Sequence, residues 1–241
     1  RAKEQYGVTM PVVRAMEEKG IVKLESMRIY RDPLDLMISR SDQKQEEVKM
    51  QTGRDFFLNE EQQLAVQTIL KEWDQKDKSV YLLHGVTGSG KTEVYMELID
   101  FVRKQSKQAI FLIPEIALTY QMVLRFYQRF GSRVSILHSR MSAGERYDQY
   151  EKAKNGEIDI MIGPRSALFT PFSNLGIIII DEEHEESYKS ETVPRYHARE
   201  TAQRRAEMEG AKLILGSATP SVESYYRAEK GEYCLLEMKR R

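Results

Sequence analysis

The segment 85–92 constrains the fold of this chain more than any other. It reads Gly-Val-Thr-Gly-Ser-Gly-Lys-Thr, which matches the P-loop pattern G-x-x-x-x-G-K-[S/T]. It follows the apolar run 80–83 and precedes a helix-like segment at 91–104. Such a junction binds phosphate because backbone N–H groups of the turn and the positive end of the helix point at it. We expect Lys91 to reach the β- and γ-phosphates and Thr92 to hold Mg²⁺. The phosphate cradle would consist of Gly85, Gly88, Ser89 and Gly90.

Apolar segments alternate with helix-like segments along the chain, which predicts an α/β fold. We expect strands at 80–84, 109–113, 134–138, 158–163, 176–181 and 211–216. We expect helices at 60–73, 91–104, 115–130, 142–155, 198–209 and 219–230, with a strand after them. Continuously apolar strands are typical of a parallel sheet that is buried on both faces. The alternation therefore predicts a doubly wound, mainly parallel sheet, with ligands beyond the carboxyl ends of its strands.

Three parts are expected along the chain. Residues 1–31 read as a helix that ends near Gly20, followed by a short hairpin, as in the C-terminal part of a winged-helix-like domain. A peripheral hairpin without a DNA role fits equally well, since thirty residues cannot bury a core alone. Residues 32–54 are expected to form a polar linker, because 39–47 contains no large apolar side chain. The main domain is expected at 55–241.

Charge and cysteine content restrict the possible functions. Lys plus Arg equals Asp plus Glu at 37 each, so any nucleic-acid contact must come from a local cluster or groove. The single cysteine, Cys234, excludes an intrachain disulfide and a cysteine-based zinc cluster within this chain, and it fits a reducing cytoplasm. Apolar runs such as 177–180 are far shorter than the roughly 20 residues that span a bilayer. The first residues contain no signal region and no initiator Met, which favours a fragment of a longer protein.

An acidic turn follows the most apolar strand. The segment 177–184 reads Ile-Ile-Ile-Ile-Asp-Glu-Glu-His. Asp181 would lie beside the P-loop and bind the Mg²⁺ that Thr92 holds, and Glu182 would polarise a water in line with the γ-phosphate. An acidic turn alone is commonplace. Together with a P-loop it indicates ATP hydrolysis, with Lys91, Asp181 and Glu182 as the catalytic residues.

Several strings resemble known helicase motifs. The segments 85–92, 181–184 and Gly-Ser-Ala-Thr-Pro at 216–220 resemble motifs I, II and III of the superfamily 2 DExH helicases. Other strings resemble the primosomal helicases that restart stalled bacterial replication forks. They are Pro-Glu-Ile-Ala-Leu-Thr at 114–119, His-Ser at 138–139, Arg-Ser-Ala-Leu-Phe at 165–169 and Arg-Tyr-His-Ala-Arg at 195–199. The resemblance runs from about residue 57 to the end. It departs at Pro164, where Thr is expected and where proline removes a backbone donor that could contact DNA.

The resemblance implies a RecA-like P-loop NTPase domain, the first motor lobe of a 3′-to-5′ DNA helicase. It implies ATP and Mg²⁺ as cofactors, single-stranded and forked DNA as the substrate, and primosome and single-strand-binding proteins as partners at bacterial replication forks. A second lobe with the arginine finger, and zinc-binding cysteines, are expected outside this chain. This chain alone should therefore bind nucleotide with hydrolysis near zero.

The resemblance also assigns roles to single residues. Gln62 is implied to read adenine through its side-chain amide, and the alternative is a solvated helix residue. Thr119, Arg165 and Ser166 are implied to contact the phosphates of one DNA strand, and the alternative is that they cap loops.

The polar loop 185–199 contains several rings and a cation. Tyr188, Arg195 and Tyr196 resemble the aromatic-rich loop that couples DNA to hydrolysis in this family. Exposed rings can stack on bases at about 1–3 kcal/mol per base. In the alternative arrangement, the tyrosines pack beneath the loop against the sheet.

His184 lies between the acidic turn and this loop. We expect it to contact the hydroxyls of Ser217 and Thr219 and so connect the ATP site with DNA. A histidine that is merely hydrogen-bonded is the alternative.

Two other functions remain compatible with a P-loop. A small kinase would transfer phosphate to a metabolite, but the string at 216–219 and the acid pair followed by His184 fit it poorly. A module that binds DNA without hydrolysis would bind equally well after Lys91→Ala.

Overall fold

The computed structural model describes residues 9–23, 57–75 and 79–240. The chain divides into two compact units, 1–31 and 32–241. In the first unit, helix α2 (Met10–Glu18) ends in a turn where Gly20 has φ +70° and its N–H donates to the carbonyl of Glu17. Such a left-handed glycine is the usual end of a helix. The predicted hairpin beyond residue 23 and the predicted linker at 32–54 lie outside the described residues.

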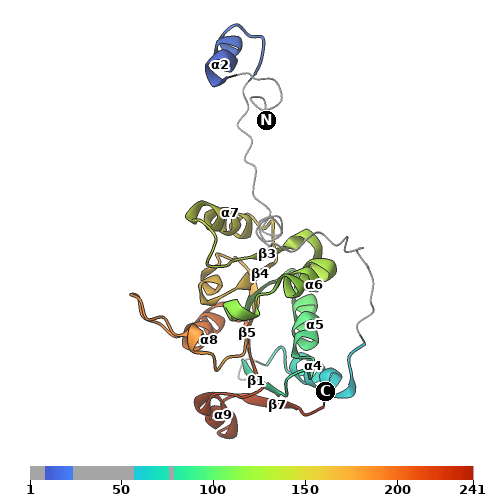
Figure 1. The fold of residues 1–241 in the computed structure, drawn as a ribbon. Coiled ribbons are helices and arrows are strands. Elements are labelled where there is room, and N and C mark those ends of the chain that lie inside the picture. The colour runs from blue at the N-terminus through green and yellow to red at the C-terminus, as the bar shows by residue number, and fades with distance from the viewer. Residues whose placement is uncertain (1–8, 24–56, 76–78, 241) are drawn as a thin grey trace. The chain divides into compact units, whose positions relative to one another are not determined.

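The second unit contains a seven-stranded sheet in which all neighbouring strands are parallel (Figure 1). The strand order is β3-β4-β2-β5-β6-β1-β7. The strands are β1 (Val80–Gly85), β2 (Gln108–Leu112), β3 (Val134–Ile136), β4 (Ile160–Gly163), β5 (Leu175–Asp181), β6 (Lys212–Ser217) and β7 (Cys234–Met238). The prediction of a doubly wound parallel sheet is confirmed.

The described part of this unit contains six helices, of which α4 precedes β1 and the other five lie between strands. They are α4 (Glu60–Lys71), α5 (Lys91–Lys104), α6 (Tyr120–Phe130), α7 (Ala143–Lys154), α8 (Ala198–Glu209) and α9 (Val222–Glu229). Short 3₁₀ turns are η1 (Glu115–Ala117), η2 (Gly131–Arg133), η3 (Arg165–Phe169) and η4 (Glu186–Tyr188).

Two helices, predicted at 115–130 and 219–230, begin later than predicted. Thr119 is extended and its hydroxyl accepts from the N–H of Met122, so α6 begins only at residue 120. Ser221 caps α9 in the same way through the N–H of Ser224. A cap residue adopts a non-helical conformation, which ends any helix that precedes it.

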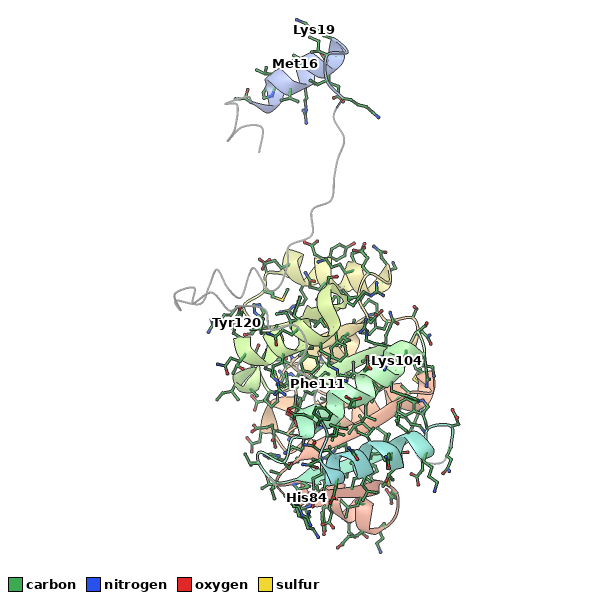
Figure 2. The ribbon with its side chains drawn as sticks, turned by 90° about the vertical axis from the view of Figure 1, so that its right-hand side faces the viewer. Met16, Lys19, His84, Lys104, Phe111 and Tyr120 are labelled. Atoms are coloured by element: carbon green, nitrogen blue, oxygen red, sulfur yellow. The ribbon has the colours of Figure 1, made fainter. Side chains whose placement is uncertain are left out.

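The two faces of the sheet pack against separate apolar clusters, because side chains alternate along each strand. In β1, Tyr81 and Leu83 point to the face covered by α4, α5 and α6. Val80 and Leu82 point to the opposite face, where α8 packs (Figure 1). Phe111 of β2 lies inside the first cluster (Figure 2), where its ring stacks on that of Phe126 with centroids 5.3 Å apart. None of the helices in the described ranges has the length and apolar character needed to cross a membrane.

The strand order brings three chain segments to one edge of the sheet. Strand β6 lies between β1 and β5, with Gly216 paired to Leu83 on one side and to Asp181 on the other. The three strands therefore deliver the P-loop, the acidic turn and the segment 217–220 next to one another.

Candidate active site at the carboxyl edge of the sheet

The P-loop joins the end of β1 to the start of α5. Gly88 and Gly90 have φ angles of +82° and +80°, a conformation that side chains disfavour. A Cβ at Gly90 would also lie 2.1 Å from Nε2 of Gln62. The Nζ of Lys91 donates to the carbonyl of Gly85 over 2.8 Å, and Thr92 at the second helical position is half-buried. The predicted P-loop residues thus form one compact turn at a helix N-terminus.

One buried polar atom in this turn has no hydrogen-bond partner among the residues that the structure describes. The Oγ of Ser89 is buried without a hydrogen bond. Buried polar atoms in native proteins are nearly always paired, so such an orphan fits a loop that is completed by a ligand.

The acidic turn faces the P-loop. The Oε1 of Glu182 lies 3.8 Å from Nζ of Lys91. The predicted meeting of these two segments is therefore present in the structure. Glu182 has φ +47°, a conformation that costs a non-glycine residue about 1–3 kcal/mol. Such strain is concentrated at functional sites, and here it belongs to a turn whose carboxylate faces the P-loop lysine.

Asp181 is half-buried, and two tyrosines hold it. Its Oδ1 accepts from the hydroxyl of Tyr95 over 2.9 Å, and its backbone carbonyl accepts from the hydroxyl of Tyr188 over 2.7 Å. Burial raises the pKa of Asp181 from 3.8 to about 6, and the hydrogen bond from Tyr95 opposes that rise. Burial and the nearby Asp181 raise the pKa of Tyr95 well above 10.0, so its hydroxyl remains a donor.

His184 connects the acidic turn with the segment after β6. Its Nδ1 lies 2.7 Å from Oγ of Ser217, and its Nε2 lies 3.4 Å from Oγ1 of Thr219. Its Nδ1 also lies 3.6 Å from a carboxylate oxygen of Glu182. The two predicted partners of His184, Ser217 and Thr219, are therefore its neighbours. Ser217 is fully buried, whereas Thr219 is exposed.

Sequence reasoning assigned no role to Glu183, and the structure gives it one. Its buried carboxylate accepts from Nη1 of Arg199 over 2.9 Å, from the backbone N–H of Ser221 over 2.6 Å and from Oγ of Ser224 over 2.9 Å. This buried ion pair joins the acidic turn to α8 and to the start of α9. The spacing of Ser221 and Ser224 is typical of a helix cap and could be recognised in the sequence. That spacing gives no indication that Glu183 is the partner of these residues.

Gln62 is buried against the P-loop. Its Oε1 accepts from the N–H of Asn59 over 2.8 Å, and its Nε2 donates to the carbonyl of Ser89 over 3.0 Å. The alternative of a solvated helix residue is therefore wrong. The amide ties the first turn of α4 to the phosphate loop, which is a suitable position for contact with a nucleotide.

The residues assigned to DNA phosphates occupy different surroundings. Arg165 donates through Nη1 to the carbonyls of Ser187, over 2.9 Å, and Lys189, over 2.7 Å. Arg165 and Ser166 line one pocket of about 310 Å³ together with Pro114, Glu115 and Ser139. Thr119 is not among the residues of that pocket, and its hydroxyl caps α6.

The expectation of an exposed Tyr188 ring is wrong. Its side chain is 1% exposed and packs in the apolar cluster beneath the sheet, because η4 turns the ring inward. The alternative packing beneath the loop holds for this residue. Tyr196 is half-buried, with its ring edge-on to that of Phe169 at 5.3 Å, and Arg195 is exposed.

Across the described ranges, no three His, Cys, Asp or Glu side chains form a group that could hold a metal ion. Thr92 and Asp181, together with phosphate oxygens and water, could give a divalent cation at this edge a set of oxygen ligands. That arrangement is typical of Mg²⁺.

A parallel sheet with a P-loop after one strand and an acidic turn two strands away defines a RecA-like P-loop NTPase lobe. The model of the family described as "Type III restriction enzyme, res subunit" matches residues 55–222, and the chain belongs to this family. More particularly, its sequence is similar to replication restart protein PriA, which confirms the resemblance to the primosomal helicases. Identity is 47% over 230 residues with the protein of Bacillus subtilis (strain 168), covering 95% of this chain and 27% of the relative. With that of Synechocystis sp. it is 41% over 222 residues, covering 90% and 24%. The chain thus spans about a quarter of these relatives.

Solved helicase structures share the fold. RecG bound to a three-way DNA junction superposes with a TM-score of 0.57 at 23% identity, covering 78% of this chain and 24% of RecG. The DUF1998 helicase MrfA bound to DNA gives a TM-score of 0.53 at 18% identity, covering 76% and 27%. At these identities the likeness establishes the RecA-like architecture.

Proposed function

We propose that this chain is the ATP-binding first motor lobe of a 3′-to-5′ DNA helicase that acts at stalled replication forks. The observation that carries the proposal is the approach of Lys91 Nζ to Glu182 Oε1 at 3.8 Å, which places the phosphate loop and the acid turn in one site. The name of the relatives, replication restart protein, and their high identity support the cellular role in the bacterial cytoplasm.

The residues present fit a bound Mg²⁺–ATP. Ser89 offers a hydroxyl that has no hydrogen bond within the described ranges, and Lys91 would exchange the carbonyl of Gly85 for the β- and γ-phosphates. Thr92 and Asp181 would hold the Mg²⁺, which when bound neutralises charge that develops on the phosphates. Glu182 would accept a proton from the attacking water. Gln62 would contact adenine after releasing one of its present partners.

The motor requires parts that lie outside the described lobe. We assign residues 1–31 to a winged-helix-like unit, 32–54 to a linker and 55–241 to the first lobe. A second lobe would supply the arginine finger, and zinc would bind only outside this chain. The isolated chain should therefore bind nucleotide while hydrolysing it hardly at all.

DNA would contact the lobe at the edge formed by η3, α6 and the loop after the acidic turn. Arg165, Ser166 and Thr119 would contact backbone phosphates, and Arg195 and Tyr196 would contact the strand from the loop. His184 lies between Ser217 and Thr219 and close to Glu182, so it would couple DNA binding to the proposed catalytic base Glu182. The wider complex would include forked DNA, primosome proteins and single-strand-binding protein.

The test is nucleotide binding by the 241-residue chain, measured by the fluorescence anisotropy of a labelled ATP analogue with Mg²⁺. Lys91→Ala should weaken binding at least about 10-fold, because it removes a charged phosphate contact. Lys104→Ala is the matched control at the other end of α5 (Figure 2), where the side chain pairs only with Asp100 of the same helix among the ion pairs described. Equal affinity of the Lys91→Ala chain and wild type would refute the proposal and favour a module that does not use the P-loop.

A further inference from the structure

The hydroxyl of Tyr95 reaches Asp181 from the far side of a strand. Tyr95 lies on α5, one turn after Lys91, and its ring is fully buried beside Phe111. Asp181 ends β5, and β6 lies between β5 and the strand that leads into α5. The 2.9 Å hydrogen bond to Oδ1 of Asp181 therefore passes the end of β6.

Gly216 of β6 leaves the room for this contact. A Cβ at this position would lie 1.6 Å from the hydroxyl oxygen of Tyr95 and 3.4 Å from Oδ1 of Asp181. The φ angle of Gly216 is not in the left-handed region that favours glycine, so the backbone conformation does not explain why this residue is a glycine. The space that the Tyr95 hydroxyl needs does explain it.

The acids on either side of Glu182 have chemically different partners. Glu183 is neutralised by Arg199 in a buried ion pair. The side chain of Asp181 instead receives a hydrogen bond from a neutral phenol. A neutral donor orients a carboxylate and compensates part of its desolvation without cancelling its charge. The negative charge of Asp181 therefore remains available to a cation, whereas the charge of Glu183 is compensated by Arg199 within the fold.

We propose that Tyr95 is a positioning residue for the Mg²⁺-binding carboxylate of Asp181, and that Gly216 is glycine so that Tyr95 can act. By holding Oδ1, Tyr95 fixes the plane of the carboxylate and leaves the second oxygen for the cation or its water. This inference rests on the proposed function, in which Asp181 serves Mg²⁺.

The experiment compares nucleotide affinity in Mg²⁺ and in EDTA for the 241-residue chain. Wild type should bind the labelled ATP analogue more tightly in Mg²⁺. Tyr95→Phe should lose about 10-fold in Mg²⁺ and little in EDTA, because only the metal-bound state uses the oriented carboxylate. Gly216→Ala should lose the same advantage, since its Cβ displaces the hydroxyl.

Tyr233→Phe is the matched control. Tyr233 is also buried, and its hydroxyl donates to Oε1 of Gln203 over 2.9 Å and not to a residue of the acidic turn. It should keep the wild-type affinities in both buffers. An unchanged Mg²⁺ advantage in Tyr95→Phe, or equal weakening in both buffers, would overturn the inference, and this holds even where Gly216→Ala fails to fold. Failure of the proposed function is distinct, because wild type itself would then show no Mg²⁺-dependent binding.

Discussion

Removal of Arg199 should destabilise the lobe far more than removal of any surface arginine. Its side chain is 8% exposed, and that of its partner Glu183 is 0% exposed. Within the described part of the chain, Arg199 is the one cation within 4.0 Å of Glu183. Arg199→Met would leave a buried carboxylate without a counter-charge, at a cost of about 3–5 kcal/mol. Glu183→Gln should cost less, about 1–3 kcal/mol, because Arg199 also pairs with the exposed Glu223.

Urea unfolding of the wild type, the two single variants and the double variant at pH 7.5 measures this difference. The double variant Glu183→Gln/Arg199→Met should be less destabilised than the sum of the single changes, because the second change removes the stranded charge. Arg204→Met is the control on the same helix, where an exposed pair with Glu207 contributes roughly 1 kcal/mol or less. Losses of less than about 1 kcal/mol in Arg199→Met would refute the view that this pair holds the acidic turn.

Three further predictions concern the acidic turn and its loop. Asp181→Asn should raise the free energy of unfolding of the metal-free chain by up to about 3 kcal/mol at pH 8 but hardly at pH 3. The reason is that the pKa of Asp181 is raised from 3.8 to about 6, so the wild type loses stability as the pH rises through that window and Asp181 becomes charged. A difference in urea unfolding between wild type and variant that does not change with pH would contradict this. Glu182→Gln in a chain that also carries a second motor lobe should keep ATP binding while turnover falls by about 100-fold or more, and wild-type turnover would exclude Glu182 as the base. Tyr188→Ala should cost about 3–5 kcal/mol of stability, whereas Tyr196→Ala should cost under about 1.5 kcal/mol and mainly reduce DNA-stimulated hydrolysis; equal thermal shifts would be inconsistent with their different burial.

Much of the fold follows from local sequence signals. Helices α5 and α8 begin and end where predicted, because a P-loop starts the first and Gly210 in a left-handed conformation ends the second. The meeting of Lys91 with Glu182 was also predictable, since parallel strands carry their carboxyl ends to the same edge. These features depend on patterns within one segment or on a general rule of topology.

Side-chain partners across the sheet could not be predicted in this way. Tyr95 and Asp181 meet only because of the order of β5, β6 and β1 and the missing side chain at Gly216. The inward turn of Tyr188 depends on a three-residue 3₁₀ turn, for which its polar surroundings in the sequence gave no signal. Long-range geometry decided both cases, and propensity or periodicity does not encode it.

The central claim is that the P-loop and the acidic turn share one Mg²⁺–triphosphate. A crystal structure of the chain with Mg²⁺ and a non-hydrolysable ATP analogue tests it most directly. We expect the cation about 2.0–2.1 Å from Oγ1 of Thr92, the Asp181 carboxylate within reach of it directly or through one water, and Lys91 on the terminal phosphates. A nucleotide bound away from residues 85–92, or a cation with no link to Asp181, would contradict the account.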